Sequence, residues 1–202
     1  GAEKSIMYIH WGREYELIPN NEQLALAQKL CDLGIDVIIG GHPHVIQPIA
    51  LLESSTNPNH KTVCLYSTGN AVSNQRLGYI SAIKTAHTED GVLFTVTFEK
   101  YSDGTVYLAG VNALPTWVNK HTNSIGRTEY NILPLDYDRI DEWANWFEVD
   151  GTTLNAAKES YARTMDILKM GLEEVTQYLV QEKSIREDLY QKAVMNMNNS
   201  RE

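Results

Sequence analysis

The chain is poor in positive charge and in cysteine. It has 17 lysines and arginines against 26 aspartates and glutamates in 202 residues, which gives a formal net charge of −9 at neutral pH. This balance disfavours nucleic acid and anionic membranes as partners, and an acidic polymer would be repelled unless divalent ions offset the charge locally. The two cysteines, Cys31 on an apolar helix face and Cys64 inside a strand, favour buried thiols over a disulfide.

The most informative motif is Gly40-Gly41-His42-Pro43-His44, which follows an apolar run. Because proline pushes the preceding residue toward an extended conformation, we expect His42 to be extended and both imidazoles to project to one side. Converging imidazoles are common ligands of zinc, iron or manganese, and the two glycines would let the backbone approach the ion. The motif therefore predicts half of a metal site. The alternative is a pair of surface histidines in a turn.

A further histidine, His10, ends the apolar run of residues 5–10. Residues 20–34 then carry apolar side chains at helical spacing between an asparagine cap and a glycine stop, and the apolar run 35–40 follows. This order predicts a buried strand, a helix and a second strand. In such a unit the strands run parallel and their carboxyl ends share one rim of the sheet. We therefore expect His10 to lie close to the two histidines of the first motif.

Several motifs together resemble a known family: His10-Trp-Gly-Arg-Glu14-Tyr15, Pro19, Gln23, Leu26-Ala27, Gly40-Gly41-His42-Pro43-His44-Val45-Ile46-Gln47-Pro48 and Tyr66-Ser67-Thr68-Gly69-Asn70. In this order, over about residues 4–76, they resemble the CapA family of capsule synthesis, or poly-gamma-glutamate biosynthesis, proteins. That family belongs with the calcineurin-like metallophosphoesterases. The resemblance departs at Ala71, where the family usually has phenylalanine.

The resemblance implies a dinuclear centre of divalent metal ions such as manganese, zinc or iron. His10 and His42 would serve one ion, and His44 the other. The superfamily also uses an aspartate cluster and an Asn-His pair followed by an acidic residue, and nothing before His10 supplies them. We therefore expect the chain to be the carboxyl-terminal part of such a protein, unable to turn over substrate alone.

Five residues are candidates for catalysis or substrate binding. His44 and Glu14 are the candidate proton-transfer groups, although a surface glutamate is the alternative for the latter. Trp11 and Tyr15 are candidates to stack on a substrate, with plain packing as the alternative. Asn70 is a candidate to hydrogen-bond a ligand or the histidine loop, with capping of a turn as the alternative.

The rest of the first two thirds of the chain is typical of strands. We expect them at residues 45–52, 62–67, 79–85, 92–98 and 106–111, the last three as antiparallel hairpins separated by Asp-Gly turns. Prolines and polar residues predict loops after these strands: Pro115, residues 119–128 and Pro134.

The last fifty or so residues change to a helical pattern. One apolar stripe has members mainly three and four residues apart: Leu154, Ala157, Tyr161, Met165, Leu168, Leu172, Val175 and Leu179. It predicts a long core-facing helix, with a heptad dimer as the alternative. A second helix is expected at about 189–197, with disorder after it. The fold class is therefore α/β: the carboxyl-terminal portion of a metallophosphoesterase-like α/β sandwich over residues 1–136, and a helical extension over 137–202.

By resemblance, the expected function is metal-dependent hydrolysis or transfer in the synthesis of a capsule or another extracellular polymer. The expected partners are an anionic polymer or a phosphate-bearing substrate and the capsule synthesis machinery, and the expected location is the cell envelope, outside the cytoplasm. The alternatives are a non-catalytic polymer-binding or scaffold subunit and an incomplete half-domain. An uncovered face at residues 5–10 would lead to a homo-oligomer, or be covered by a missing amino-terminal half or by a helix at about 153–180.

Overall fold

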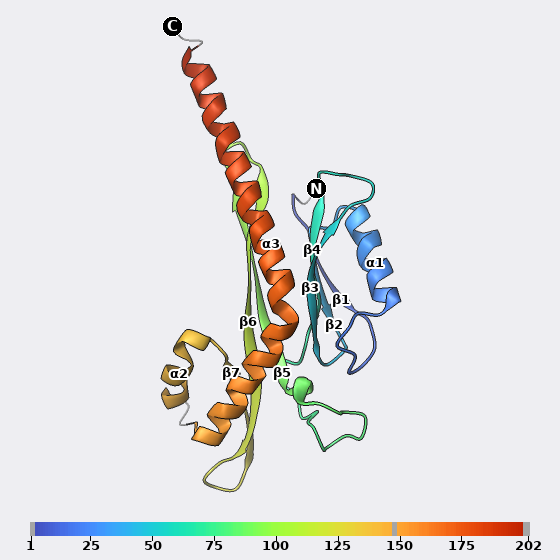
Figure 1. Cartoon of the computed structure of the whole chain (residues 1–202), viewed down its shortest axis with the longest axis vertical. Helices are drawn as coiled ribbons and strands as arrows, with labels where there is room; N and C mark the ends of the chain where they lie inside the picture. Colours follow the sequence, from blue (N-terminus) through green and yellow to red (C-terminus); the bar gives the residue numbers. More distant parts are fainter. Residues whose placement is uncertain (1–2, 147–148, 200–202) are drawn as a thin grey trace.

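The computed structural model describes residues 3–146 and 149–199, and side chains up to residue 192. It contains a four-stranded sheet, a three-stranded sheet and a long carboxyl-terminal helix (Figure 1). The predicted class, an α/β structure followed by a helical tail, is confirmed. The division after residue 136 stays a prediction. Among the described residues, none of the helices is long and apolar enough to span a membrane.

The four-stranded sheet contains β1 (Ile6–His10), β2 (Val37–Gly41), β3 (Ile46–Glu53) and β4 (Lys61–Thr68). The strand order is β1-β2-β4-β3, with β3 antiparallel to β4 and the other pairs parallel. Helix α1 (Asn21–Asp32) connects β1 to β2, so the predicted strand, helix and strand are confirmed. The register pairs His10 with Gly41, which brings both carboxyl ends to one rim.

Two glutamines fix the loop between β1 and α1. Gln23 completes a reciprocal capping box with Asn20 at the start of α1. Its buried amide Nε2 donates to Gln47 Oε1 on β3 at 2.8 Å, and Gln47 Nε2 donates to the Glu16 carbonyl at 2.8 Å. The loop is therefore tied to the helix on one side and to the sheet on the other.

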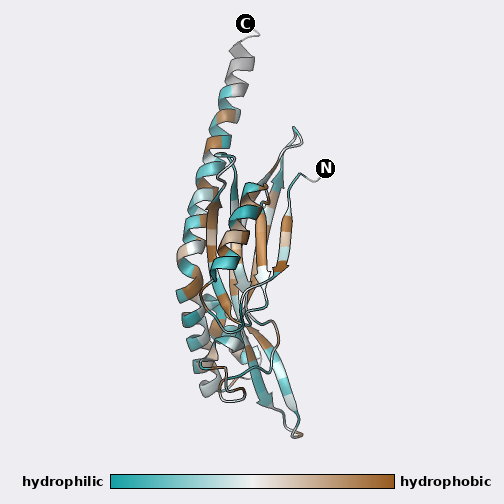
Figure 2. Ribbon diagram, turned by 90° about the vertical axis from the view of Figure 1, so that its right-hand side faces the viewer, coloured by the Kyte–Doolittle hydropathy of each residue, from teal (hydrophilic) through white to brown (hydrophobic). Residues whose placement is uncertain are grey.

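The inner strands of the four-stranded sheet are covered on both faces. Helix α1 lies on one face over Ile38, Cys64 and Tyr66. The opposite face packs on the three-stranded sheet and on the carboxyl-terminal helix through Ile49, Leu65 and their neighbours. Figure 2 shows hydrophobic segments on the strands beside α1 and an alternation of hydrophobic and hydrophilic residues along the long helix.

The three-stranded sheet contains β5 (Asp90–Lys100), β6 (Val106–Thr122) and β7 (Thr128–Pro134), all antiparallel. The strands predicted at 92–98 and 106–111 are confirmed, but both extend further. The loops predicted around Pro115 and residues 119–128 are largely replaced by β6 and β7. Pro115 fits in β6 because it lies where β6 passes the end of β7, so its missing N–H falls outside that ladder.

The strand predicted at residues 79–85 is wrong. These residues form turns that lead into the 3₁₀ helix η1 (Ala86–Glu89), and only Ile83 among them is buried. Their alternating pattern has no neighbouring strand to pair with, and without one the pattern does not specify a strand. The expected Asp-Gly hairpin turn at Asp90 is also wrong, because Asp90 and Gly91 open β5.

The carboxyl-terminal region begins with η2 (Tyr137–Arg139) and α2 (Ile140–Trp146), and ends with α3 (Gly151–Asn199). The separate helix predicted at 189–197 is wrong: α3 is continuous, because no glycine or proline interrupts residues 180–190. The helix continues to Asn199, past the predicted start of the disordered tail, and residues 200–202 lie outside the described ranges.

The apolar stripe of α3 faces the core. Leu168, Val175 and Leu179 are buried against β3, β4 and β6, which confirms the core-facing interpretation over the heptad dimer. A Cβ at Gly171 would lie 1.9 Å from the Ile49 carbonyl oxygen, so this glycine lets the helix rest directly on β3. Figure 1 shows α3 passing along both sheets and extending beyond them at its carboxyl end.

Strand β1 is an edge strand and is not a buried one as predicted. Ile6 is 53% exposed and Tyr8 is 69% exposed. The helix expected to cover this face packs on β3 and β6 instead, so that prediction is wrong. Self-association through the face that carries these side chains stays a prediction.

Candidate functional site

Three histidine rings gather at the carboxyl ends of β1 and β2. His10 ends β1, and His42 and His44 follow β2. The ring centroids are 4.3 Å apart for His10 and His42, and 6.1 Å apart for His42 and His44. The proximity predicted from parallel strand ends is confirmed. The assignment of these side chains as metal ligands stays a prediction.

The backbone at this rim is strained. Tyr15 (φ 67°), His42 (φ 99°) and His44 (φ 59°) are the non-glycine residues with positive φ in the described part of the chain. The expectation of an extended His42 is therefore wrong: the turn between β2 and β3, tied by the Tyr15 N–H donating to the Pro43 carbonyl at 2.7 Å, overrides the proline's bias. Such conformations cost about 1–3 kcal/mol each and cluster at functional sites.

Glu14 joins two of the histidines in a group of potential metal-binding atoms. One ligand atom from each of Glu14, His42 and His44 lies within 4.8 Å of the others. Within the described residues, this is the one such group of three or more His, Cys, Asp or Glu side chains. His10 lies outside it. Sequence reasoning missed Glu14 as a ligand candidate, because a glutamate in a loop gives no signal of where its carboxylate points.

Asn70 sets the orientation of the His44 ring. Its Nδ2 donates to the carbonyl oxygens of His44 (3.1 Å) and Thr88 (2.9 Å), so its Oδ1 must be the atom that faces His44 Nδ1 at 2.9 Å. An amide oxygen only accepts, and His44 Nδ1 therefore carries the proton. In the neutral ring this leaves the Nε2 lone pair free, and Nε2 lies 3.8 Å from Glu14 Oε1. A hydrogen-bonded Nδ1 and a free Nε2 are typical of a metal-binding imidazole.

These hydrogen bonds also bear on the predicted roles of Asn70. The residue is 9% exposed, and its side chain hydrogen-bonds the ring of His44. A hydrogen bond to the histidine loop is one of the roles predicted from the sequence. Binding of substrate by Asn70 stays a prediction.

Tyr15 lies beside the potential metal ligands Glu14, His42 and His44, which are called the donor group below. Its ring centroid is 6.2 Å from that of His44. Burial, and then the charge and hydrogen bonding of Glu14, raise the pKa of the Tyr15 hydroxyl above its ordinary value. The hydroxyl therefore keeps its proton and can donate to the carboxylate.

Trp11 is packed inside the protein. It is 8% exposed, its Nε1 donates to the Tyr66 carbonyl at 2.8 Å, and the two rings stack at 5.7 Å, which favours packing over substrate stacking. A Cβ on Gly40 would lie 2.0 Å from that carbonyl oxygen, and one on Gly41 would lie 2.5 Å from the Tyr8 hydroxyl. Both glycines therefore make room for Trp11, Tyr66 and Tyr8, and their role in the approach of an ion stays a prediction.

The glutamine pair was also missed as part of the site. A Cβ on Gly12 would lie 2.6 Å from Gln23 Oε1, so the loop that carries Glu14 rests directly on this buried amide. The signal was present in the sequence, since an asparagine followed three residues later by glutamine is a capping box. The partner, Gln47, could be found only as a polar residue inside an otherwise apolar strand.

The donor group has the chemistry of a transition-metal site. Two imidazoles and a carboxylate suit zinc, iron or manganese. Metal–ligand bonds of about 2.0–2.2 Å place the ligand atoms of one ion roughly 3–4 Å apart. The ligand atoms of Glu14, His42 and His44 lie within 4.8 Å of one another, so a modest side-chain movement would bring them to this spacing. The side chains of Glu14 and His44 are 50% and 31% exposed, which leaves room for it.

Comparison with known proteins gives matches in the part of the chain that contains this rim. Residues 2–75 match the family model described as bacterial capsule synthesis protein PGA_cap. A segment of 74 residues, 37% of this chain, is 40% identical to the PGA biosynthesis protein CapA of Bacillus subtilis (strain 168) and covers 18% of it. A match of the same length is 36% identical to the capsule biosynthesis protein CapA of Bacillus anthracis and covers 16% of it. The chain thus matches less than a fifth of the length of these relatives.

Proposed function

We propose, from the match of residues 2–75 to the bacterial capsule synthesis family, that the chain contributes to the synthesis of a capsule or of poly-gamma-glutamate. We propose further that the rim from His10 to Asn70 contributes ligands to a metal-dependent site for hydrolysis or group transfer in the whole protein, and that this chain alone is inactive. The observation that carries this second proposal is the convergence of ligand atoms from Glu14, His42 and His44 within 4.8 Å. The fixed protonation of His44 supports it, because the atom left free is the one that faces the group.

His42, His44 and Glu14 would hold a divalent ion, and His10 is the candidate for a further ligand because its ring lies 4.3 Å from that of His42. When bound, manganese, zinc or iron would lower the pKa of a water molecule and polarise a phosphoryl or carbonyl oxygen. Which of the three metals is used depends on their availability as well as on the donor set.

The chain's own residues orient the group and move the proton. Asn70 holds the His44 ring, and Glu14 lies close enough to the Tyr15 hydroxyl to raise its pKa, so that this hydroxyl is a candidate donor to the carboxylate. Half-exposed Glu14 is the candidate to accept a proton from a water molecule at the rim, and His44 is the second candidate. Tyr15 remains the candidate to contact substrate, because Trp11 is buried.

The proposed substrate is an anionic polymer or a phosphate-bearing molecule. The chain's net charge of −9 opposes its approach, and divalent ions at the rim would offset this charge where the substrate binds. Capsule synthesis machinery is the proposed partner, and the cell envelope is the proposed location, both by analogy with the capsule proteins that the segment matches.

The second candidate is a non-catalytic polymer-binding or scaffold subunit. One observation favours it: the donor group in the described residues holds one carboxylate, and a dinuclear site needs carboxylates that bridge two ions. The two candidates differ in whether polymer binding requires the histidines. If the scaffold role is correct, His44→Ala will leave the sedimentation of the chain with poly-gamma-glutamate unchanged.

Calorimetric titration with manganese and with zinc tests the metal-dependent proposal. We expect weak, saturable binding by the wild type and a loss of about tenfold or more in His44→Ala, because a direct ligand is removed. His121→Ala is the matched control, since this histidine lies on β6 beside Glu129, outside the donor group. Equal affinities in wild type and His44→Ala would contradict the proposal.

A phosphodiester assay separates binding from turnover. With bis-nitrophenyl phosphate and either metal, we expect no turnover by residues 1–202, because three histidines and one glutamate cannot hold two ions. Robust metal-dependent turnover that is lost in His44→Ala would show that these residues suffice for catalysis.

A further inference from the structure

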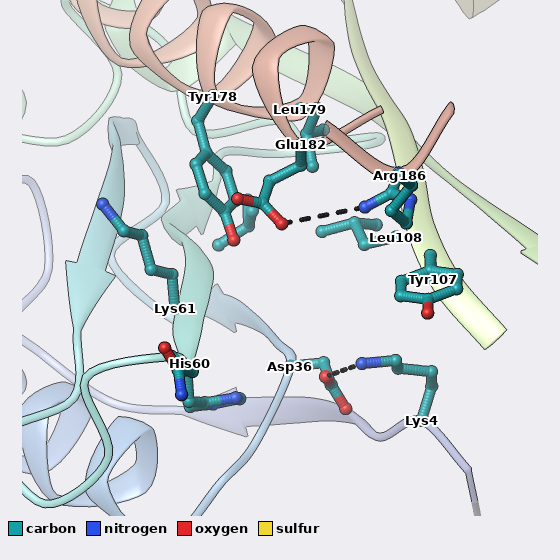
Figure 3. Close-up of a pocket in the computed structure, with 12 residues that line it drawn as sticks. Lys4, Asp36, His60, Lys61, Tyr107, Leu108, Tyr178, Leu179, Glu182 and Arg186 are labelled. Atoms are coloured by element: carbon teal, nitrogen blue, oxygen red, sulfur yellow. Dashed lines mark hydrogen bonds and ion pairs between the residues drawn. The ribbon is translucent and has the colours of Figure 1, made fainter. Parts of the chain in front are cut away.

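A second polar cavity lies at the opposite end of the four-stranded sheet. Lys4 precedes β1, Asp36 precedes β2 and Lys61 opens β4, so the cavity is at the amino ends of the parallel strands. It has a volume of about 180 Å³ and is closed by late turns of α3 (Figure 3). A five-residue strand separates this end from the histidine rim, which corresponds to roughly 16 Å. The cavity is therefore distinct from the proposed metal site.

The cavity is lined by more cations than carboxylates, although the chain is acidic. Three cations line it, Lys4, Lys61 and Arg186, together with the carboxylates Asp36 and Glu182. Figure 3 shows the cations on different sides of the cavity. This composition contrasts with the chain's net charge of −9.

The two lysines already have close carboxylate partners. Lys4 Nζ donates to Asp36 Oδ1 at 2.8 Å, and Lys61 Nζ donates to Glu53 Oε1 at 2.5 Å. Asp36 also accepts from the backbone N–H and the hydroxyl of Ser5. Their charges are therefore largely matched within the protein.

Arg186 is different. Its Nε and Nη2 are buried and have no hydrogen-bond partner among the described residues. Its Nη1 lies 3.8 Å from Glu182 Oε2, which is an ion-pair distance and too long for a hydrogen bond. The guanidinium stacks on the Tyr107 ring at 4.3 Å, which holds its plane without using the in-plane N–H groups. A buried charged donor without an acceptor is costly, so this edge of Arg186 requires an explanation.

Another arginine of the same helix shows what this edge binds. Arg163 donates from Nε and from Nη2, both at 2.6 Å, to the two carboxylate oxygens of Asp90. This fork geometry is the one in which guanidinium recognises carboxylates and phosphates. In Arg186 the same two atoms are buried and are not matched by a side chain of the described residues, and the residue itself lines the cavity.

We propose that the cavity bounded by Lys4, Lys61 and Arg186 binds a small oxyanion, either a carboxylate or a phosphate, on the guanidinium of Arg186, whose Nε and Nη2 have no other partner among the described residues. A volume of about 180 Å³ leaves room for several water molecules, and so for an anion of that size. The ligand would contact α3 and the amino ends of the strands at once, and its binding would stabilise their association.

Titration calorimetry of the full chain with inorganic phosphate and, separately, with acetate tests the proposal. EDTA is present, so that no metal at the histidine rim contributes to binding. We expect saturable binding of at least one anion, and the stronger of the two identifies the ligand as phosphate or carboxylate. Arg186→Gln is expected to weaken binding about tenfold or more, because two charge-assisted hydrogen bonds are lost.

Two further variants make the result specific. Arg186→Lys keeps the charge and loses the fork, so we expect affinity between those of wild type and Arg186→Gln. Lys169→Gln removes one positive charge from an exposed position of α3 and is expected to bind as the wild type does. Thermal unfolding without anion checks that each variant folds. Absence of saturable binding by the wild type, or equal binding by wild type and Arg186→Gln, would overturn the proposal.

Discussion

The Asp90 cluster and the histidine rim both bring polar side chains together, but they satisfy them in opposite ways. Asp90 is 1% exposed, and its carboxylate accepts hydrogen bonds from Ser160 and from Nε and Nη2 of Arg163. At the rim, His44 Nε2 and Glu14 Oε1 approach to 3.8 Å without a hydrogen bond. The backbone of His42 is strained at the rim. Both carboxylate oxygens of Asp90 accept hydrogen bonds from the protein. At the rim, in contrast, His44 Nε2 remains available to bind a metal ion.

The difference separates stability from function. A buried carboxylate with a bidentate arginine ties α3 to the start of β5, and its loss leaves an unpaired buried charge. The rim is half-exposed and strained, so it contributes little to stability and keeps ligand atoms free. If this distinction holds, substitutions in the two places will affect different measurements.

The largest expected effect is the loss of the Asp90 carboxylate. Asp90→Ala should lower the free energy of unfolding by about 3–5 kcal/mol, because the Arg163 side chain, which is 21% exposed, remains mostly buried without its partner. Asp141→Ala, which breaks an exposed pair with Lys158, is the matched control and should cost about 1 kcal/mol or less. Chemical denaturation measures both. Similar losses in the two variants would break the comparison.

An intermediate effect is expected at Asn70, which has both roles. Asn70→Ala should cost about 1–3 kcal/mol, because the carbonyls of His44 and Thr88 lose their donor. It should also reduce metal affinity by about 10–100-fold, since the His44 ring is no longer held. Asn112→Ala, at an exposed position of β6, should change neither quantity. A change in stability with unaltered metal affinity would show that Asn70 has a structural role only.

The smallest expected change in stability is at His42. His42→Gly should alter the free energy of unfolding by no more than about 1 kcal/mol, because relief of the positive φ offsets the lost contacts and the added chain entropy. Metal binding should be lost in the same variant. Gly34→Ala is the reciprocal control: it adds a Cβ at φ 88° in open space and should be destabilising. A loss for His42→Gly as large as that of Asp90→Ala would mean that the rim is a structural cluster.

The sequence predicted the first sheet well, because local patterns determine it. Apolar runs, a capped helix and a glycine stop are sufficient for β1, α1 and β2. The strand expected at 79–85 failed because a strand depends on a partner that no local pattern reveals. The continuous α3 was divided in two because apolar spacing weakens beyond Leu179, although the polar residues that follow are good helix formers.

For the candidate site, topology predicted which residues meet and local rules failed on how they are held. Parallel strand ends brought His10 to His42. The conformation of His42 was wrong because tertiary contacts override the bias before proline. The acceptor role of Asn70 and the position of Glu14 depend on side-chain hydrogen bonds across more than twenty residues of sequence, or on loop geometry, which no motif encodes.

The most direct test of the central claim is nitrogen NMR of the histidine rings during a zinc titration. We expect His44 to keep its proton on Nδ1 throughout, and its Nε2 resonance to shift as zinc binds, together with a ring nitrogen of His42. His121 should not respond. Zinc coordination through His44 Nδ1, or rings at the rim that do not respond to zinc, would contradict the claim that this rim is built as a metal site.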